Sequence, residues 1–256
     1  MIALVTGASS GIGRDMARYL NSLGYDLIIT ARDKDKMEEL KLELNSKNDK
    51  IVDIYVKDLS KTAECVNLYN TVKEKYKNID VLINNAGFGL CGEFINTDLD
   101  FELQMIDTNI KAVHILTKLF LKDMIKSNSG RILNVGSIAS FMPGPLMETY
   151  YSTKNYVLRL TQGIKEELNK MNSNVKISVL CPGPVDTNFN NVANVKFALR
   201  GMSSEYVAKY AIDKMLKNKT VISVGFKVKA VRILSKISPD SISAKICYHM
   251  QKKKFK

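Results

Sequence analysis

Three side chains in the middle of the chain have the types and spacing needed to move a proton to or from an oxygen. Tyr150 and Lys154 are four residues apart at the start of a predicted helix, so they project from the same helix face. A phenol with a pKa of ~10 is a poor base at neutral pH, and a nearby ammonium lowers that pKa. Ser137, which follows an apolar strand-like run, could hydrogen-bond a substrate oxygen. The three predict acid–base chemistry; for Tyr150 and Lys154 alone, an exposed pair on a helix surface is the alternative.

A glycine-rich loop near the N-terminus has the pattern of a phosphate-binding turn. It follows an apolar run and ends where a helical pattern begins. Glycines let the backbone approach a pyrophosphate, and the free N–H groups at a helix N-terminus attract anions. The alternative is a glycine-rich turn that binds nothing. The predicted strand before the loop and the predicted helix after it disfavour this interpretation. The expected dinucleotide contacts in this loop are Gly7, Ser9, Ser10, Gly11, Ile12 and Gly13.

The end of the second predicted strand indicates which dinucleotide binds. Where an NAD site usually carries an acidic residue for the adenosine ribose, this chain has Ala31 followed by Arg32, and Arg14 lies just past the glycine loop. A guanidinium can hold a 2′-phosphate through two charge-assisted hydrogen bonds. We therefore predict NADP(H) over NAD(H), with both arginines at the phosphate. Alternatively both are solvated surface charges, and Asp33 and Asp35 could weaken the preference.

Alternating strand-like and helix-like segments must position these residues. The apolar runs are short and separated by longer amphipathic segments, which is typical of a parallel sheet with helices on both faces. Strands are expected at Ile2–Thr6, Asp26–Thr30, Ile51–Tyr55, Ile79–Ile83, Gly130–Val135, Val175–Leu180 and Thr220–Ser223. Helices are expected at Gly11–Leu23, Asp33–Ser46, Lys61–Tyr76, Asp98–Lys126, Thr149–Met171 and Ser204–Lys217. We predict an α/β fold: a single-domain, Rossmann-like, doubly wound parallel sheet of about seven strands in the order 3-2-1-4-5-6-7, with ligands at the carboxyl ends of the strands.

Taken in chain order, these motifs resemble the short-chain dehydrogenase/reductase family. The resemblance covers Ile2 to Phe226 and rests on the Gly-x-x-x-Gly-x-Gly loop, on Asn84-Asn85-Ala86-Gly87, and on Ser137 followed by Tyr150-x-x-x-Lys154. It implies that Asn109 completes a catalytic tetrad by holding a water that relays protons to Lys154, which also binds the nicotinamide ribose. Other cofactor contacts that it implies are Asp58, Asn85, Ala86, Gly87, Tyr150, Pro182, Gly183, Val185 and Thr187.

Two of these assignments have structural alternatives, and the resemblance also implies an assembly. Asp58 could be no more than the N-terminal end of the next helix, and Asn109 could bond across a helix kink. The family pattern implies a homodimer or homotetramer through the long helices expected at Asp98–Lys126 and Thr149–Met171. A non-catalytic NADP-binding sensor or scaffold is the alternative function, which the complete tetrad disfavours.

The segments expected to border the substrate are apolar. Residues 88–91, 141–147 and 185–202 are rich in Phe, Leu, Val and Met, and the first two contain no acidic residue. An apolar carbonyl or the matching secondary alcohol is therefore the expected substrate. For any single one of these side chains, core packing is the more common role. Asn188 to Gly201 is expected to form a lid over the substrate.

Composition narrows the class of protein. The chain has 256 residues, of which 45% are hydrophobic and 25% charged, as in ordinary globular domains. The four cysteines show no CxxC spacing, and there are only two histidines, so neither a metal site nor a disulfide framework is expected. Neither a signal peptide nor a stretch of ~18–20 uninterrupted apolar residues is recognisable. We expect a cytoplasmic protein.

The positive charge is concentrated at the C-terminal end. The net charge is +12, and residues 226–256 contribute +8 of it, so the rest of the chain carries only +4. We expect an NADP-binding domain at 1–226, including the catalytic site and lid, and a basic amphipathic tail at 227–256, with Pro239 in the first turn of its second helix. The tail could bind an anionic membrane surface or pack on its own domain, and packing is favoured. Nucleic-acid binding is not expected, because the tail has few aromatic residues and no recognisable motif.

Overall fold

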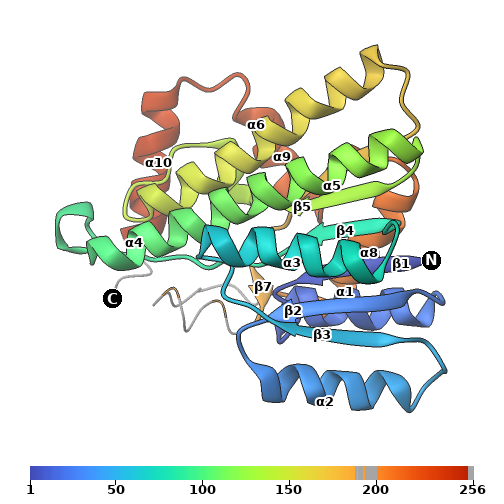
Figure 1. Cartoon of the computed structure of the whole chain (residues 1–256). Helices are drawn as coiled ribbons and strands as arrows, with labels where there is room; N and C mark the ends of the chain where they lie inside the picture. The colour runs from blue at the N-terminus through green and yellow to red at the C-terminus, as the bar shows by residue number, and fades with distance from the viewer. Residues whose placement is uncertain (188, 190–192, 194–200, 253–256) are drawn as a thin grey trace.

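A parallel sheet of seven strands forms the centre of the protein (Figure 1). This computed structural model describes residues 1–187, 189, 193 and 201–252. The order across the sheet is β3-β2-β1-β4-β5-β6-β9, which confirms the predicted order because β9 is its seventh strand along the chain. The strands are β1 (Ile2–Thr6), β2 (Asp26–Ala31), β3 (Val52–Val56), β4 (Val81–Asn84), β5 (Arg131–Val135), β6 (Lys176–Cys181) and β9 (Val221–Ser223).

The strand order reverses at β1, which pairs with β2 on one side and β4 on the other. Ala3 of β1 is in register with Leu27 of β2 and with Val81 of β4, and both pairings are parallel. In open sheets of this kind, ligands bind outside the carboxyl ends of the strands beside the point of reversal. The loops that follow β1 and β4 meet at that point.

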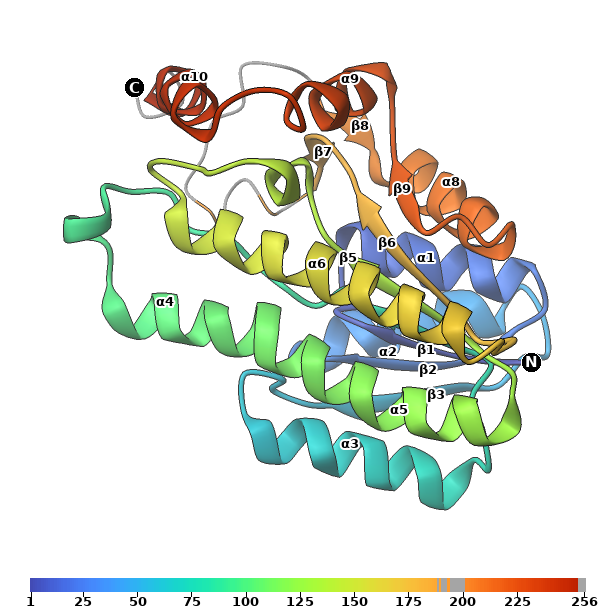
Figure 2. The ribbon, with the colours of Figure 1, turned by 90° about the horizontal axis from the view of Figure 1, so that it is seen from above.

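Helices cover both faces of the sheet (Figure 2). One layer contains α1 (Gly11–Ser22), α2 (Lys34–Asn45) and α8 (Ser204–Leu216), and the other contains α3 (Thr62–Lys75), α5 (Val113–Ser127) and α6 (Glu148–Lys170). Successive residues of a strand serve opposite layers: Ala3 and Val5 pack with the first set of helices, and Leu4 packs with the second. Burial on both faces explains why the strands are continuous apolar runs.

The helix predicted over Asp98–Lys126 is one helical run with a change of hydrogen bonding inside it. It starts with α4 (Leu99–Ile106), where Asp98 accepts a capping hydrogen bond from the main-chain nitrogen of Phe101 at 2.7 Å. Asp107–Ala112 is π-helical, and α5 follows directly. Short π-helical turns are rare and often mark functional sites. Asn109 lies in this one.

The C-terminal segment forms two helices, α9 (Phe226–Leu234) and α10 (Asp240–Lys252). Pro239 directly precedes α10 rather than lying in its first turn, and its carbonyl accepts from the main-chain nitrogens of Ile242 and Ser243. Figure 2 shows both helices on the side of the sheet where β7 and the loop after β5 lie. The end of the chain is therefore brought to the carboxyl ends of the strands.

The segment between β6 and α8 contains two short strands that the sequence did not predict. Val185–Asp186 (β7) pairs in parallel with Met202–Ser203 (β8). The expected lid, Asn188 to Gly201, falls mostly outside the described residues. Within the described residues, no helix is both long and apolar enough to cross a bilayer.

Candidate active site

A cavity of about 840 Å³ lies along the carboxyl ends of the strands. Its wall is formed by the loops that follow β1 to β6 and by α9 and α10. The predicted site residues that line it are Gly7, Ser9, Ser10, Gly11, Ile12, Arg32, Asp58, Asn85, Ala86, Gly87, Ser137, Tyr150, Lys154, Pro182, Gly183, Val185 and Thr187. Gly13, Arg14 and Asn109 do not line it.

The glycine loop presents main chain to this cavity. A Cβ at Gly13 would lie 2.3 Å from Nδ2 of Asn85 and 2.4 Å from the carbonyl oxygen of Gly7, so only glycine fits there. Ser10 precedes α1 and its side chain makes no capping hydrogen bond, which leaves the first N–H groups of the helix available. Those groups and the helix dipole favour an anion. The loop therefore fits the pyrophosphate of a dinucleotide.

Asn85 holds the glycine loop against the loop after β4. Its Nδ2 donates to the carbonyl oxygens of Thr6 and Gly7 at 3.0 and 3.1 Å. The hydroxyl of Thr6 in turn accepts from the main-chain nitrogens of Asn85 and Ala86 at 2.9 and 3.0 Å. These four hydrogen bonds fix the separation of two walls of the cavity.

Beyond the glycine loop the cavity is lined by charged side chains, which are Arg32, Asp33, Lys36, Lys57 and Asp58. Nζ of Lys36 pairs with the carboxylate of Asp33 at 2.6 Å, which offsets one of the negative charges expected to oppose a 2′-phosphate. Asp58 accepts hydrogen bonds from the main-chain nitrogen and the hydroxyl of Ser60 at 3.1 and 2.8 Å. Desolvation raises the pKa of Asp58, but the Ser60 hydrogen bonds together with the charges of Arg32 and Lys61 hold that pKa below its usual value.

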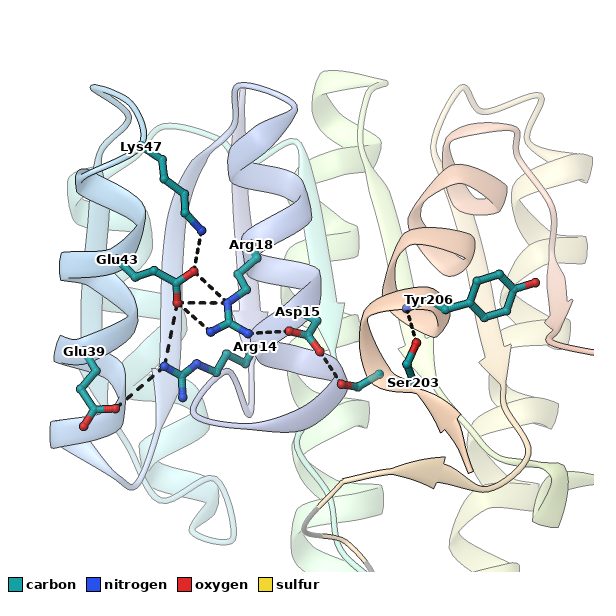
Figure 3. A network of polar contacts seen from close by, with 9 residues as sticks. Arg14, Asp15, Arg18, Glu39, Glu43, Lys47, Ser203 and Tyr206 are labelled. Atoms are coloured by element: carbon teal, nitrogen blue, oxygen red, sulfur yellow. Dashed lines mark hydrogen bonds and ion pairs between the residues drawn. The ribbon is translucent and has the colours of Figure 1, made fainter. Parts of the chain in front are cut away.

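Arg14 lies against α2 instead of on the cavity (Figure 3). Its Nη2 is 3.9 Å from a carboxylate oxygen of Glu39 and 4.0 Å from one of Glu43. Glu43 also pairs with Arg18 at 2.7 Å, and Arg18 with Asp15 at 2.8 Å, so the network joins α1 to α2. Of the two arginines predicted at a 2′-phosphate, only Arg32 lines the cavity.

Tyr150, in the first turn of α6, is buried and 8% exposed. Burial is the largest effect on this group and raises the pKa of Tyr150 to about 12, against the opposing effect of a hydrogen bond with Ser137. The Tyr150–Lys154 spacing predicted a lowered pKa, whereas in the structure the pKa is raised, because desolvation outweighs the Ser137 hydrogen bond. At neutral pH the phenol is protonated and can act as a proton donor.

Lys154 lies one turn further along α6, as the spacing predicts. Its Nζ is 5.9 Å from the centroid of the Tyr150 ring and donates a 2.9 Å hydrogen bond to the carbonyl oxygen of Val135 at the end of β5. Burial lowers the pKa of Lys154 to about 8. Most of the lysine is still protonated at pH 7, so the cavity holds a cation beside a neutral phenol.

Asn109 is fully buried behind the cavity wall. Its Nδ2 donates to the carbonyl of Phe88 at 2.8 Å and to the hydroxyl of Thr153 at 3.1 Å, and its Oδ1 accepts from the main-chain nitrogen of Phe88 at 3.1 Å. A Cβ at Gly87 would lie 2.7 Å from Oδ1 of Asn109 and 3.3 Å from Nζ of Lys154, so the three residues are neighbours. The Asn109 side chain thus fixes the loop after β4, and its proton-relay role stays a prediction.

A family model for short chain dehydrogenases matches residues 1–197. The chain belongs to the short-chain dehydrogenase family. An uncharacterized oxidoreductase of Staphylococcus saprophyticus is 33% identical over 186 residues, which cover 73% of this chain and 79% of that protein. A short-chain dehydrogenase from Sphingobium yanoikuyae, solved in complex with NADPH, is 27% identical with a TM-score of 0.85, covering 94% of each chain. A bulky-bulky ketone specific alcohol dehydrogenase from Comamonas testosteroni is 26% identical with a TM-score of 0.81, covering 92% of this chain and 91% of the other.

Membership of the short-chain dehydrogenase family makes the chain an oxidoreductase, and its neighbours support a nicotinamide cofactor. The motif resemblance, however, ends at Phe226 and could not identify the wall that α9 and α10 supply. The cavity residues from these two helices and their connection that the sequence analysis missed are Lys227, Val228, Val231, Leu234, Ser235, Ser238, Ser243, Ile246, Cys247, Met250 and Gln251. The spacing of apolar residues in the tail indicated that one of its faces could pack against protein. It did not indicate which part of the protein that face would contact.

Residues from the segments expected to border the substrate of this short-chain dehydrogenase do line the cavity. They include Phe88, Met142, Met147, Val185 and Phe189. The ring of Phe189 lies 5.3 Å from that of Tyr150, which places an aromatic surface beside the phenol. Within the described residues, no cluster of three or more potential metal ligands is found.

Proposed function

We propose that the chain is an NADP(H)-dependent oxidoreductase that interconverts an apolar carbonyl compound and the matching secondary alcohol. The observation that carries this proposal is that Ser137, Tyr150 and Lys154 line the same cavity as the glycine loop. A dinucleotide with its pyrophosphate on that loop and its other end toward Tyr150 would bring its reactive ring to the acid–base group. Proximity of this kind supplies much of the rate of an enzyme.

The side chains divide the chemistry among them. The nicotinamide ring of a bound cofactor supplies the hydride in the reducing direction. The Tyr150 phenol, protonated at neutral pH, donates its proton to the carbonyl oxygen, and Ser137 hydrogen-bonds that oxygen as its charge develops. The Lys154 ammonium stabilises the phenolate left behind, and Asn109 serves the proton relay implied by the family resemblance. In the oxidising direction the same groups act in reverse.

The preference for NADP(H) rests on the charged end of the cavity. Arg32 lines it, Lys36 lies nearby, and the carboxylate of Asp33 is already paired with Lys36. A 2′-phosphate would meet the Arg32 guanidinium without an uncompensated carboxylate from Asp33 opposing it. Arg14 does not line the cavity, and its Nη2 lies 3.9 and 4.0 Å from carboxylate oxygens of Glu39 and Glu43, so we assign the phosphate contact to Arg32 alone.

An apolar ketone suits the remainder of the cavity. Its lining there comes from methionine, phenylalanine and aliphatic side chains, among them Met142, Met147, Phe189, Val231 and Ile246. Methionines adapt to irregular shapes, which favours a bulky or lipid-like substrate. The bulky-bulky ketone specific neighbour from Comamonas testosteroni supports the same class by analogy.

We also propose a peripheral contact between the tail and an anionic membrane surface. One face of α9 and α10 packs on the cavity, where Val228 and Cys247 are buried. Away from the cavity, α9 exposes large apolar side chains, including Phe226 at 84% and Ile233 at 64%, and Ile237 in the connection to α10 is 77% exposed, among lysines. A helix pair with this division suits the interface of a bilayer. The cytoplasmic location and the homodimer or homotetramer stay predictions.

A direct assay tests the proposed activity. The purified chain is mixed with NADPH and a series of aliphatic and aromatic ketones, and absorbance of the reduced nicotinamide is followed. Ketone-dependent oxidation of NADPH that requires Tyr150 supports the enzyme. Binding of NADPH without turnover of any ketone or alcohol favours the alternative, a sensor or scaffold.

A further inference from the structure

A glutamine near the end of the chain contacts the tyrosine next to the catalytic one. Nε2 of Gln251 in α10 donates a 2.6 Å hydrogen bond to the hydroxyl of Tyr151 in α6. Gln251 is only 2% exposed, and both side chains line the cavity. The ring of Tyr151 packs against Gly144, where a Cβ would lie 2.0 Å from the ring, so its position is fixed. Gln251 and Tyr151 therefore place two hydrogen-bonded polar groups at a fixed position in the cavity wall.

The amide oxygen of Gln251 has no partner. It is buried, and no hydrogen-bond donor among the described residues reaches it. The three serines of α9, α10 and their connection that line the cavity differ, because the hydroxyl of each finds an acceptor: Ser235 the carbonyl of Arg232, Ser238 that of Pro239, and Ser243 the hydroxyl of Ser238. Buried polar groups are nearly always hydrogen-bonded. Among the described residues, eight have a buried side-chain atom without a partner, and of these eight only Gln251 lines the cavity.

The amide oxygen of Gln251 lies in a mainly apolar part of the cavity, so a polar group of a ligand would be recognised at this point. Most other cavity side chains of α10 and of the loop after β5 are apolar or weakly polar, such as Met142, Met147, Ile246, Cys247 and Met250, and the exceptions are the hydroxyls of Ser137 and Ser243. The rings of Tyr150 and Tyr151 are 6.2 Å apart, so one molecule can contact both residues. Because the Tyr151 oxygen accepts from Gln251, its own hydrogen is left to donate.

We infer that Gln251 and Tyr151 recognise a hydroxyl group of the substrate that is separate from the reacting carbonyl. A hydroxyl can donate to the amide oxygen of Gln251 and accept from the phenol of Tyr151, whereas a second carbonyl could only accept. The substrate class is then an apolar hydroxy ketone, or the corresponding diol. This inference rests on the proposed function, because it takes the reacting carbonyl to lie at Tyr150.

The test compares straight-chain methyl ketones of increasing length with the same ketones carrying a terminal hydroxyl. For the full-length chain with NADPH, kcat/KM for the hydroxy ketone should exceed that for the plain ketone by about tenfold at the best chain length. Gln251→Leu should lower that ratio to near one. Gln162→Leu, which removes an amide from the outer face of α6, is the matched control and should leave the ratio unchanged.

Two further measurements keep the inference falsifiable. If Gln251→Leu has lost its thermal unfolding transition, Tyr151→Phe gives the decision, since it removes the second partner of the hydroxyl. A ratio that is unchanged in a folded, active variant overturns the inference. If the wild-type chain turns over no ketone, the proposed function fails; calorimetric titration with a long-chain diol and the matching mono-alcohol then decides, and equal affinities overturn the recognition of a second hydroxyl.

Discussion

The ammonium of Lys154 donates a 2.9 Å hydrogen bond to the carbonyl oxygen of Val135, and this contact ties the start of α6 to the end of β5. It orients the lysine, whose Nζ is 5.9 Å from the centroid of the Tyr150 ring. Burial raises the pKa of Tyr150 and lowers that of Lys154. The phenol is thus kept as an acid while the lysine titrates close to physiological pH.

The rate of carbonyl reduction should fall as the pH rises through about 8, the pKa of Lys154. Below that pH the ammonium stabilises the negative charge that develops when Tyr150 gives up its proton, and above it this stabilisation is lost. The phenol, with a pKa of about 12, does not titrate in this range. The measurement is kcat/KM for a ketone against pH with NADPH saturating. In an active Lys154→Arg variant, whose side chain stays charged, kcat/KM should not fall in this pH range. If kcat/KM of the wild type does not change through this range, the role assigned to Lys154 is contradicted.

Replacement of Tyr150 by phenylalanine should lower kcat/KM by at least ~100-fold, because it removes the proton donor and nothing else. Tyr156→Phe is the matched control: it lies on the same helix, and its hydroxyl contacts Nδ1 of His114 at the surface. Steady-state assays and thermal unfolding are measured on both variants. Substantial activity in a folded Tyr150→Phe chain would remove this residue from the mechanism.

Gly13→Ala should destabilise the fold by ~1–3 kcal/mol and weaken dinucleotide binding, because the new Cβ meets Asn85 and the carbonyl of Gly7 at once. Gly163→Ala is the control. Gly163 lies inside α6 with nothing within 4 Å of a Cβ, and alanine there should leave stability unchanged or raise it by up to ~1 kcal/mol. Denaturant unfolding and NADPH titration measure both effects. Equal stability of the two variants would show that the loop can widen.

Short-range patterns predicted most of the framework. The strand and helix segments, the strand order and the grouping of Ser137, Tyr150 and Lys154 all follow from local periodicity and from chain order. The pKa of Tyr150 could not be predicted, because it depends on how much protein surrounds the ring. The contact between Gln251 and Tyr151 joins residues a hundred positions apart, and no local pattern reports such a distance.

Arg14 is a second case in which a local sequence pattern could not predict a contact with residues distant in the sequence. Its position just after the glycine loop made it a candidate for a 2′-phosphate, and a local pattern contains no information about Glu39 and Glu43 on the neighbouring helix. The carboxylates near its guanidinium, at 3.9 and 4.0 Å, come from a helix placed by tertiary packing. A charged residue near a site is therefore assigned safely only after its competing partners are known.

Arg32→Ala should weaken NADPH binding by roughly tenfold or more while NADH binding changes little, because a charge-assisted hydrogen bond to the 2′-phosphate is lost. Arg14→Ala should leave the ratio of the two affinities unchanged, since its side chain does not line the cavity and lies toward Glu39 and Glu43. Dissociation constants for both cofactors are measured on both variants. A change of ratio in Arg14→Ala, with none in Arg32→Ala, would reverse the assignment.

Binding to vesicles that contain anionic lipid should depend on the exposed lysines of the tail and should weaken as salt is added. Each cation near such a surface contributes ~1 kcal/mol, so exchanging three of them for glutamate should abolish co-sedimentation. The three to exchange are Lys229, Lys236 and Lys245, which are exposed and lie outside the cavity wall. A control with the same change of net charge replaces three exposed lysines of α5, which are Lys118, Lys122 and Lys126. Equal loss in both variants would mean that net charge alone draws the chain to the lipid, and no binding by the wild type would mean that the outward apolar face of α9 and α10 has another role.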